Sequence, residues 1–153
     1  MRRSCGIVVK KLIDLGERKA IKMISELISS DKNVLGLIDD CAAIDTGSEY
    51  LLVSTDMITQ KTHISKQMTP WQIGWFITAI NLSDIASCGG KPLGITLSLG
   101  LPVDTTDIFL KEIIRGASKC ATMYQTEILG GDTKENPNIT LCGTALGLVK
   151  KDN

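Results

Sequence analysis

The spacing of apolar residues along the chain predicts three helices and five short strands. Residues 17–30 place apolar side chains on one helical face, and further helices are expected over 70–88 and from Asp104 or Thr105 to about Tyr124. Thr69 before Pro70 is typical of a helix start, and Gly89-Gly90 is typical of a helix end. The expected strands cover 41–44, 50–55, 94–100, 126–129 and 139–149.

The order of these elements, α-β-β-α-β-α-β-β, favours a mixed α+β fold with one sheet. The links between strands 41–44 and 50–55 and between strands 126–129 and 139–149 are short, which predicts two hairpins rather than crossovers. No internal repeat or linker interrupts the chain, so we expect a single domain over 1–153.

Two segments are more apolar than one covered face requires. Between Trp71 and Cys88 there is no Lys, Arg or Glu, so this helix must be buried on more than one side. Its second side should meet a twin subunit, an absent domain or another helix of the same chain. Strands 94–100 and 139–149 are apolar at nearly every position, so both faces of the sheet need cover. We therefore predict a homodimer formed through the sheet.

Composition narrows the class of protein. The 153 residues include 17 basic and 17 acidic side chains, which gives no reason to expect nucleic-acid binding. The five cysteines show no C-x-x-C spacing and there is only one His, which indicates reduced thiols rather than a zinc site. No apolar run reaches the roughly 18 residues of a membrane helix, and none suits a signal peptide. We expect a cytoplasmic protein without a membrane partner.

Acidic residues recur where the chain is expected to leave the core. The segments are Asp39-Asp40, Ser54-Thr55-Asp56, Asn81-Leu82-Ser83-Asp84 and Gly130-Gly131-Asp132-Thr133. Their neighbours are small or carry hydroxyl groups. Carboxylate oxygens are the ligands that Mg²⁺ prefers, and Mg²⁺ often shares them with substrate phosphates. The alternative is that these residues simply form turns.

Asp84 is the least expected of these carboxylates, because it lies within the helix predicted over 70–88. At 100° per residue it falls on the same side as Ile73, Ile77 and Ile80. A carboxylate on an apolar stripe must be neutralised, bind a cation or accept hydrogen bonds. The alternative to a metal ligand is an Asp satisfied by backbone donors.

Three other residues are weaker candidates. His63 is the only imidazole, Tyr124 offers an aromatic face to a base, and Gly131 allows a phosphate to approach the backbone. A structural role is the alternative for each. Gly89-Gly90-Lys91 lacks the spacing of a Walker A loop.

Six segments, taken in order, resemble thiamine-monophosphate kinases, and archaeal members most closely. They are DDCAAID (39–45), LLVSTDMI (51–58), THIS (62–65), TPWQIGW (69–75), NLSDIASCGGKPLGITLSLGLP (81–102) and ILGGDTKE (128–135). NLSD is the specific element, since relatives such as selenophosphate synthetase differ there. The superfamily includes aminoimidazole ribonucleotide (AIR) synthetase.

The resemblance implies transfer of the γ-phosphoryl group of ATP to thiamine monophosphate, giving thiamine diphosphate, with Mg²⁺ ions. It also implies an N-terminal domain of the AIR synthase type, with helices on one face of the sheet and the other face free for a β-barrel shared in a homodimer. Carried over by residue, the metal-binding positions are Asp40, Ser54, Thr55, Asp56, Asp84 and Asp132. The ATP positions are Tyr124 and Gly131, and the thiamine-phosphate position is His63. Phosphoryl transfer needs no protein nucleophile, so no catalytic base is assigned.

The sequence departs from the family in three ways. Ile38 stands where the family has Gly, Ser87-Cys88 stands in place of Ala-Met, and the chain ends before the family's second domain. Three hypotheses therefore remain: a kinase that needs a separate C-terminal domain, a Mg²⁺–nucleotide-binding dimer module without turnover, and another ATP-using enzyme of the superfamily. NLSD and His63 favour the first over the third, and length favours the second for this chain as it stands.

Overall fold

A computed structural model describes the backbone of residues 11–28, 34–35 and 40–151. The chain divides into two compact units, Met1–Lys32 and Asn33–Asn153, and each is described by itself. The expectation of a single domain over 1–153 stays a prediction. Ile38 and Asp39 lie outside the described residues.

The first unit contains two helices, α1 (Leu12–Leu15) and α2 (Glu17–Leu27). The helix expected over 17–30 is confirmed as far as Leu27, and residues 29–30 lie outside the described residues. The four residues of α1 are too few to show a periodic pattern, which explains why it was not predicted.

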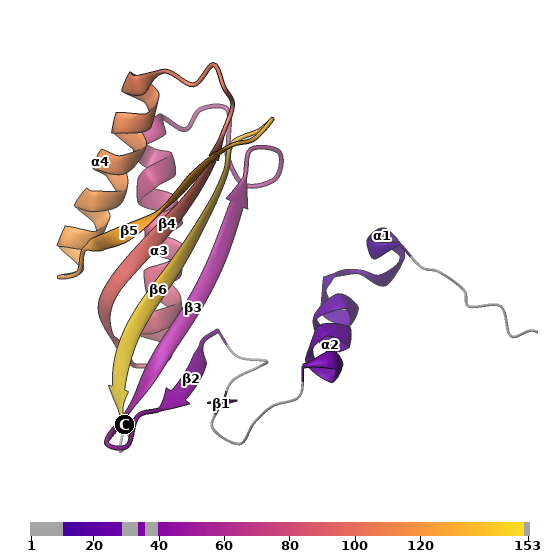
Figure 1. Cartoon of the computed structure of the whole chain (residues 1–153), viewed down its shortest axis with the longest axis vertical. Coiled ribbons are helices and arrows are strands. Elements are labelled where there is room, and N and C mark those ends of the chain that lie inside the picture. The colour runs from indigo at the N-terminus through magenta and orange to yellow at the C-terminus, as the bar shows by residue number, and fades with distance from the viewer. Residues whose placement is uncertain (1–10, 29–33, 36–39, 152–153) are drawn as a thin grey trace, which may run out of the picture. The chain divides into compact units, whose positions relative to one another are not determined.

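The second unit is built on one six-stranded sheet with the order β1-β2-β3-β6-β4-β5 (Figure 1). The strands are β1 (Val34–Leu35), β2 (Ala42–Asp45), β3 (Glu49–Thr59), β4 (Lys91–Leu101), β5 (Ile128–Glu135) and β6 (Thr140–Lys150). All pairs are antiparallel except β4 with β5. The sheet is therefore mixed, as expected.

One of the two predicted hairpins is correct and the other is wrong. β2 and β3 pair antiparallel around the turn at 46–48, as predicted. β5 and β6 do not pair, because β6 lies between β3 and β4. The link between them crosses the end of β4, where the Asn136 amide donates to the Leu101 carbonyl oxygen at 2.9 Å. The short link between β5 and β6 therefore passes over the end of β4 and does not form a hairpin.

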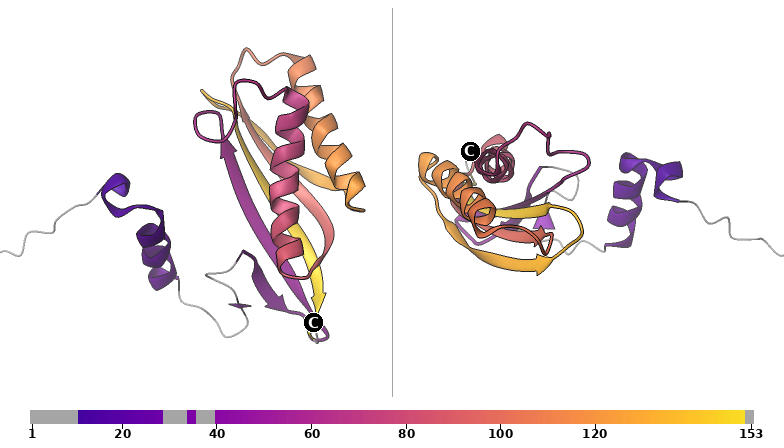
Figure 2. Two further views of the ribbon diagram at one scale, coloured as in Figure 1. Left: turned by 180° about the vertical axis from the view of Figure 1, so that it is seen from behind. Right: turned by 90° about the horizontal axis from the view of Figure 1, so that it is seen from above.

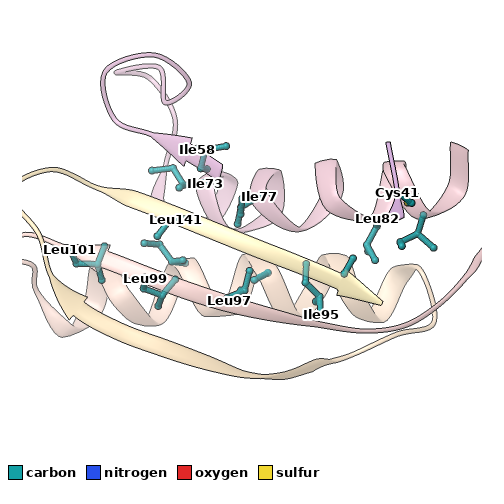
Figure 3. Packing of buried hydrophobic residues seen from close by; sticks show 14 of the residues in the cluster. Cys41, Ile58, Ile73, Ile77, Leu82, Ile95, Leu97, Leu99, Leu101 and Leu141 are labelled. Carbon is teal, nitrogen blue, oxygen red and sulfur yellow. The ribbon is translucent and has the colours of Figure 1, made fainter. Parts of the chain in front are cut away.

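Helices α3 (Pro70–Ser87) and α4 (Asp107–Met123) cover one face of the sheet (Figure 2). The side chains of Thr69 and Gln72 form the capping box at the start of α3. Thr106 caps α4, one residue beyond Thr105 and two beyond Asp104, the two expected caps. In the core (Figure 3), Ile58, Ile95 and Leu141 of β3, β4 and β6 pack against residues of the two helices. These helix residues include Ile77 and Ile85 of α3 and Ile113 of α4.

The two helices touch through glycines. A Cβ on Gly74 would lie 1.8 Å from the Ile113 carbonyl oxygen, and a Cβ on Gly116 would lie 1.9 Å from the Trp71 carbonyl oxygen. The second side of the apolar helix α3 therefore meets another helix of the same chain, which is one of the three alternatives left by the sequence.

The other face of the sheet carries no helix of the second unit among the described residues. Residues that alternate with the core positions point to this face: Ile44, Leu51, Val53, Met57, Leu146 and Leu148. Met57 is 56% exposed and Ile44 39% exposed. We call this surface the open face. The predicted fold class, an α+β domain with helices on one face and a sheet face left free, is confirmed.

Within the described residues, no helix has the length and apolar character needed to cross a membrane.

Candidate functional site

Two side chains of α3, those of Asp84 and Ser87, form hydrogen bonds with residues of β3 and of the segment before β2. Ser54, buried on β3, donates a hydrogen bond of 2.5 Å from Oγ to Asp84 Oδ2. Ser87 Oγ, one turn further along α3, lies 2.9 Å from Asp40 Oδ2 and 2.8 Å from the Asp84 carbonyl oxygen. Asp40, which precedes β2, Ser54 on β3 and the end of α3 are thereby linked by hydrogen bonds. We call Asp40, Asp56 and Asp84 the carboxylate cluster.

The side chain of Asn81 positions Asp56, the remaining carboxylate of this cluster. Its side chain is fully buried, and its Oδ1 accepts a hydrogen bond of 3.1 Å from the backbone amide of Asp56. Its Nδ2 donates to the Ile77 carbonyl oxygen at 2.8 Å. Gly143, opposite Asp56 on β6, leaves the space that the Asn81 amide fills. The Asn81 side chain therefore holds the β3 backbone in place at Asp56.

The pKa of the Asp56 carboxyl group is raised by burial and by the charges of neighbouring side chains. Burial raises its pKa most, the negative charge of Asp84 raises it further, His63 lowers it, and Asp40 adds a smaller increase. Two other carboxylates are thus close enough to make ionisation of Asp56 unfavourable, and a bound cation would relieve that cost. Burial also raises the pKa of the Cys41 thiol to about 12.

His63 lies in the turn that follows β3. Its side chain is exposed, and Nδ1 lies 3.3 Å from the Thr59 amide and 2.6 Å from Thr62 Oγ1. Its effect on the pKa of Asp56 places it within electrostatic reach of the carboxylate cluster. An exposed imidazole beside this cluster is accessible to an anionic ligand.

Thr55 and Asp132 belong to the open face rather than to the carboxylate cluster. Thr55 follows Ser54 on β3, so its side chain points to the opposite side of the sheet, where Oγ1 donates to the Gly143 carbonyl oxygen at 2.8 Å. Asp132 pairs in register with Ser98, which alternates with the buried Leu97 and Leu99. The register therefore puts Asp132 on the face away from the helices.

A bulge explains the position of Asp132. The register of β4 with β5 shifts between Ile95 and Thr96, so that β5 carries one extra residue, and the alternation of its side chains is reset. Next to it, a Cβ on Gly131 would lie 1.7 Å from the Leu97 carbonyl oxygen, so this position requires glycine. A hollow of about 280 Å³ lies beside Asp132 and is lined by residues of β4, β5 and β6, including Ser98, Lys134, Asn136 and Cys142.

Tyr124 ends α4 as its C-cap, with a side chain that is 52% exposed. Its ring is therefore accessible to a planar ligand.

The oxygen donors of the carboxylate cluster suit a hard cation such as Mg²⁺. Among the described residues, however, no three His, Cys, Asp or Glu side chains are arranged to hold one metal ion between them. The convergence of Asp40, Asp56, Asp84 and Asp132 on one metal site stays a prediction, as do the roles of Ser54, Thr55, His63, Tyr124 and Gly131.

Sequence reasoning missed two residues of this region. It assigned no role to Asn81, which appeared only as part of the segment that contains Asp84, and none to Ser87, which appeared only as a departure from the family. The signal for Asn81 was an amide on the buried side of an apolar helix, which must find partners. No comparable signal marks Ser87, because its partner Asp40 is remote in sequence.

The fold and the acidic segments define a class. The chain belongs to the family of AIR synthase related proteins, N-terminal domain, which it matches over residues 38–149.

Within that class, curated thiamine-monophosphate kinases match most of this chain. That of Methanocaldococcus jannaschii is 36% identical over 139 residues, which is 88% of this chain and 44% of the relative. That of Synechococcus elongatus is 36% identical over 143 residues, 92% of this chain and 42% of the relative. The structure of AaThiL complexed with AMPPCP and TMP superposes with a TM-score of 0.86 at 27% identity, covering 94% of this chain and 45% of that one. The chain thus spans less than half the length of the relatives it matches.

Proposed function

We propose that this chain is the ATP- and Mg²⁺-binding half of a thiamine-monophosphate kinase, which transfers the γ-phosphoryl group of ATP to thiamine monophosphate. The observation that carries the proposal is the carboxylate cluster: Asp84 of the NLSD segment, hydrogen-bonded to Ser54, close enough to Asp56 to raise its pKa. The similarity to thiamine-monophosphate kinases over most of the chain, and to a structure complexed with AMPPCP and TMP, supports it.

In this proposal the oxygen atoms of Asp40, Asp56 and Asp84 hold Mg²⁺, which would offset the charge of the phosphate groups during transfer. Ser54 orients Asp84, since its hydroxyl occupies one carboxylate oxygen and leaves the other free for a ligand. Asn81 holds the backbone at Asp56. His63, exposed beside the cluster, contacts the phosphate of thiamine monophosphate.

We also assign roles in binding Mg²⁺ and ATP to residues outside the carboxylate cluster. Asp132 would bind a further Mg²⁺ ion, Thr55 reaches metal, and Gly131 and Tyr124 contact ATP. Because Thr55 and Asp132 point away from the helices, this assignment requires either that the ligand reach both sides of the sheet or that a partner subunit bring the two groups together. We therefore include a homodimer through the open face, in the cytoplasm, in the proposal.

The experiment is a transfer assay. The chain is mixed with ATP, Mg²⁺ and thiamine monophosphate, with and without a separately expressed C-terminal half of the M. jannaschii kinase, and thiamine diphosphate is measured by chromatography. We expect little product from the chain alone, because closing the site over substrate requires the second half. With it, product should form and should be lost in Asp84→Asn. An exposed acid remote from the cluster, Asp107→Asn, is the matched control. Robust turnover by the chain alone, or full activity of Asp84→Asn, would contradict the proposal.

A second candidate is a Mg²⁺–nucleotide-binding dimer module without turnover. The carboxylate cluster lies entirely within this chain, which favours binding of Mg²⁺ and nucleotide by the chain itself. Calorimetric titration with AMPPCP and Mg²⁺ separates the two: the module binds the nucleotide but yields no thiamine diphosphate even when the C-terminal half is supplied. The third candidate, another ATP-using enzyme of the superfamily, predicts ATP consumption that does not depend on thiamine monophosphate.

A further inference from the structure

Two of the cysteines meet where β2 begins and α3 ends. Cys41 directly follows Asp40, is only 3% exposed and lies against α3 (Figure 3). Cys88 directly follows Ser87, is the C-cap residue of α3 and is partly exposed. The positions are separated by more than forty residues in sequence, yet the contact between Asp40 and Ser87 already joins the two segments one residue earlier.

The two cysteines share one hydrogen-bond acceptor. Cys41 Sγ donates to the Asp84 carbonyl oxygen at 3.2 Å, and the backbone amide of Cys88 lies 3.2 Å from the same oxygen. In addition, Cys88 packs against the hydrophobic core cluster to which Cys41 belongs. The Cys41 thiol and the Cys88 backbone thus lie against the same oxygen atom, and a disulfide can form between cysteines whose Cα atoms lie within about 7 Å of each other. The other described cysteines, Cys120 and Cys142, are also free thiols, but no such contact links them to a second cysteine.

We propose that Cys41 and Cys88 form a dithiol site that small disulfides such as oxidised glutathione convert into an intramolecular disulfide. Cys88 reacts first, because it is the partly exposed partner. Its thiolate attacks the glutathione disulfide, forms a mixed disulfide and releases one glutathione thiol. The Cys41 thiol then loses its proton and attacks the Cys88 sulfur, and the second glutathione leaves as a thiolate that takes up a proton. The two cysteines lose two electrons and two protons together, and oxidised glutathione is reduced to two thiols.

The bond would close a loop that contains β2, β3 and α3. It would also fix the backbone next to Asp40 against the end of α3, beside the Ser87 hydroxyl. Cross-linking segments far apart in sequence restricts the unfolded chain, so the oxidised protein should be more stable than the reduced protein. The proposal does not depend on the kinase assignment, because it concerns the thiols alone.

The test starts from the reduced chain, which is incubated folded with oxidised glutathione, alkylated, digested and mapped by mass spectrometry. We expect a peptide pair joined through Cys41 and Cys88, about 2 Da lighter than the sum of the reduced peptides. The melting temperature should rise by roughly 5 °C on oxidation. Both effects should vanish in Cys88→Ala, whose site is partly exposed and tolerates the smaller side chain.

Cys142→Ala is the matched control, because Cys142 is also a partly exposed free thiol, and it should form the same cross-link with the same rise in melting temperature. Four results would overturn the proposal: Cys88 remaining reduced, Cys88 stopping at the glutathione adduct, a cross-link to any other cysteine, or a Cys41–Cys88 link that forms only in denaturant.

Discussion

A Cβ built on Gly143 would lie 2.3 Å from Asn81 Nδ2, so glycine at 143 is what allows the Asn81 amide to rest on β6. Gly143→Ala should therefore push Asn81 away from Asp56 and destabilise the fold by about 1–3 kcal/mol, the usual cost of overpacking a core. Urea unfolding followed by circular dichroism measures this. As a control, Cys142→Ala changes the neighbouring residue, which lies on the open face, and should lower the free energy of unfolding by less.

A double-mutant cycle shows whether the two residues act on each other. Asn81→Ala removes the amide that the new methyl group would strike, so adding Gly143→Ala to it should cost clearly less than adding it to the natural chain. Equal costs in both backgrounds would mean that Gly143 is needed for some reason other than Asn81.

The glycines between α3 and α4 should be among the least replaceable residues. The methyl group of Gly116→Ala would overlap the Trp71 carbonyl oxygen, which cannot move without shifting a helix. We expect a loss of about 3 kcal/mol or more, or no folded protein at all. Ser118→Ala, two residues along α4 and exposed, should change stability by no more than about 0.5 kcal/mol. Thermal unfolding of the two variants makes the comparison.

The raised pKa of Asp56 predicts that the free energy of unfolding depends on pH. Its pKa is raised in the folded state by burial and by Asp84, so folding favours the protonated form. The stability it contributes is present below its ordinary pKa of 3.8 and is lost as the pH rises through the raised value. Without divalent metal, Asp56→Asn should therefore be more stable than the natural chain at pH 7, and the difference should shrink towards pH 3.

Asp45 is the control for this effect, because its pKa is shifted the other way. The hydrogen bond from Lys151 lowers it most, with help from the Gly47 amide. Asp45→Asn should therefore give no gain in stability at pH 7. A gain as large as that of Asp56→Asn would show that the effect is unrelated to the carboxylate cluster. Adding Mg²⁺ should reduce the advantage of Asp56→Asn if the cluster binds the cation.

The proposed homodimer can be tested on the open face. Met57→Lys introduces a charge at a side chain that is 56% exposed, so the subunit should still fold. If the open faces of two subunits pack together over more than about 1,000 Å², the buried lysine should convert the dimer to monomers. Sedimentation velocity at micromolar concentration measures this. Met123→Lys, on α4 and 65% exposed, should leave the dimer intact; a natural chain that is monomeric at this concentration would contradict the proposal.

Local patterns in the sequence were sufficient to locate the main helices and strands. The boundaries of α3 follow from Thr69-Pro70 at its start and Gly89-Gly90 after its end, because capping chemistry depends on neighbouring residues. The position of β6 could not be found in this way. Its continuous apolar run indicates a strand covered on both faces, but it carries no information about which strands lie on either side.

The candidate site was predictable to a similar extent. The apolar stripe around Asp84 correctly indicated a carboxylate that needs a partner, and Ser54 is that partner. The face on which Asp132 lies depends on the bulge at Ile95 and Thr96, and a one-residue shift in register moves a side chain to the other side of a sheet. No residue type near Ile95 and Thr96 indicates from the sequence that the register shifts there.

The insertion of β6 between β3 and β4 has a consequence for synthesis on the ribosome. Residues 49–59 and 91–101 are made first but have no common partner until residues 140–150 emerge. A nascent chain that has reached α4 therefore exposes two long apolar strands whose inner edges are unpaired, the situation in which strands pair with other molecules. Because the pairing of β3 with β6 joins residues so far apart in sequence, its formation should be slow as well as late. Binding of chaperones during translation should be strongest between the completion of β3 and the release of β6.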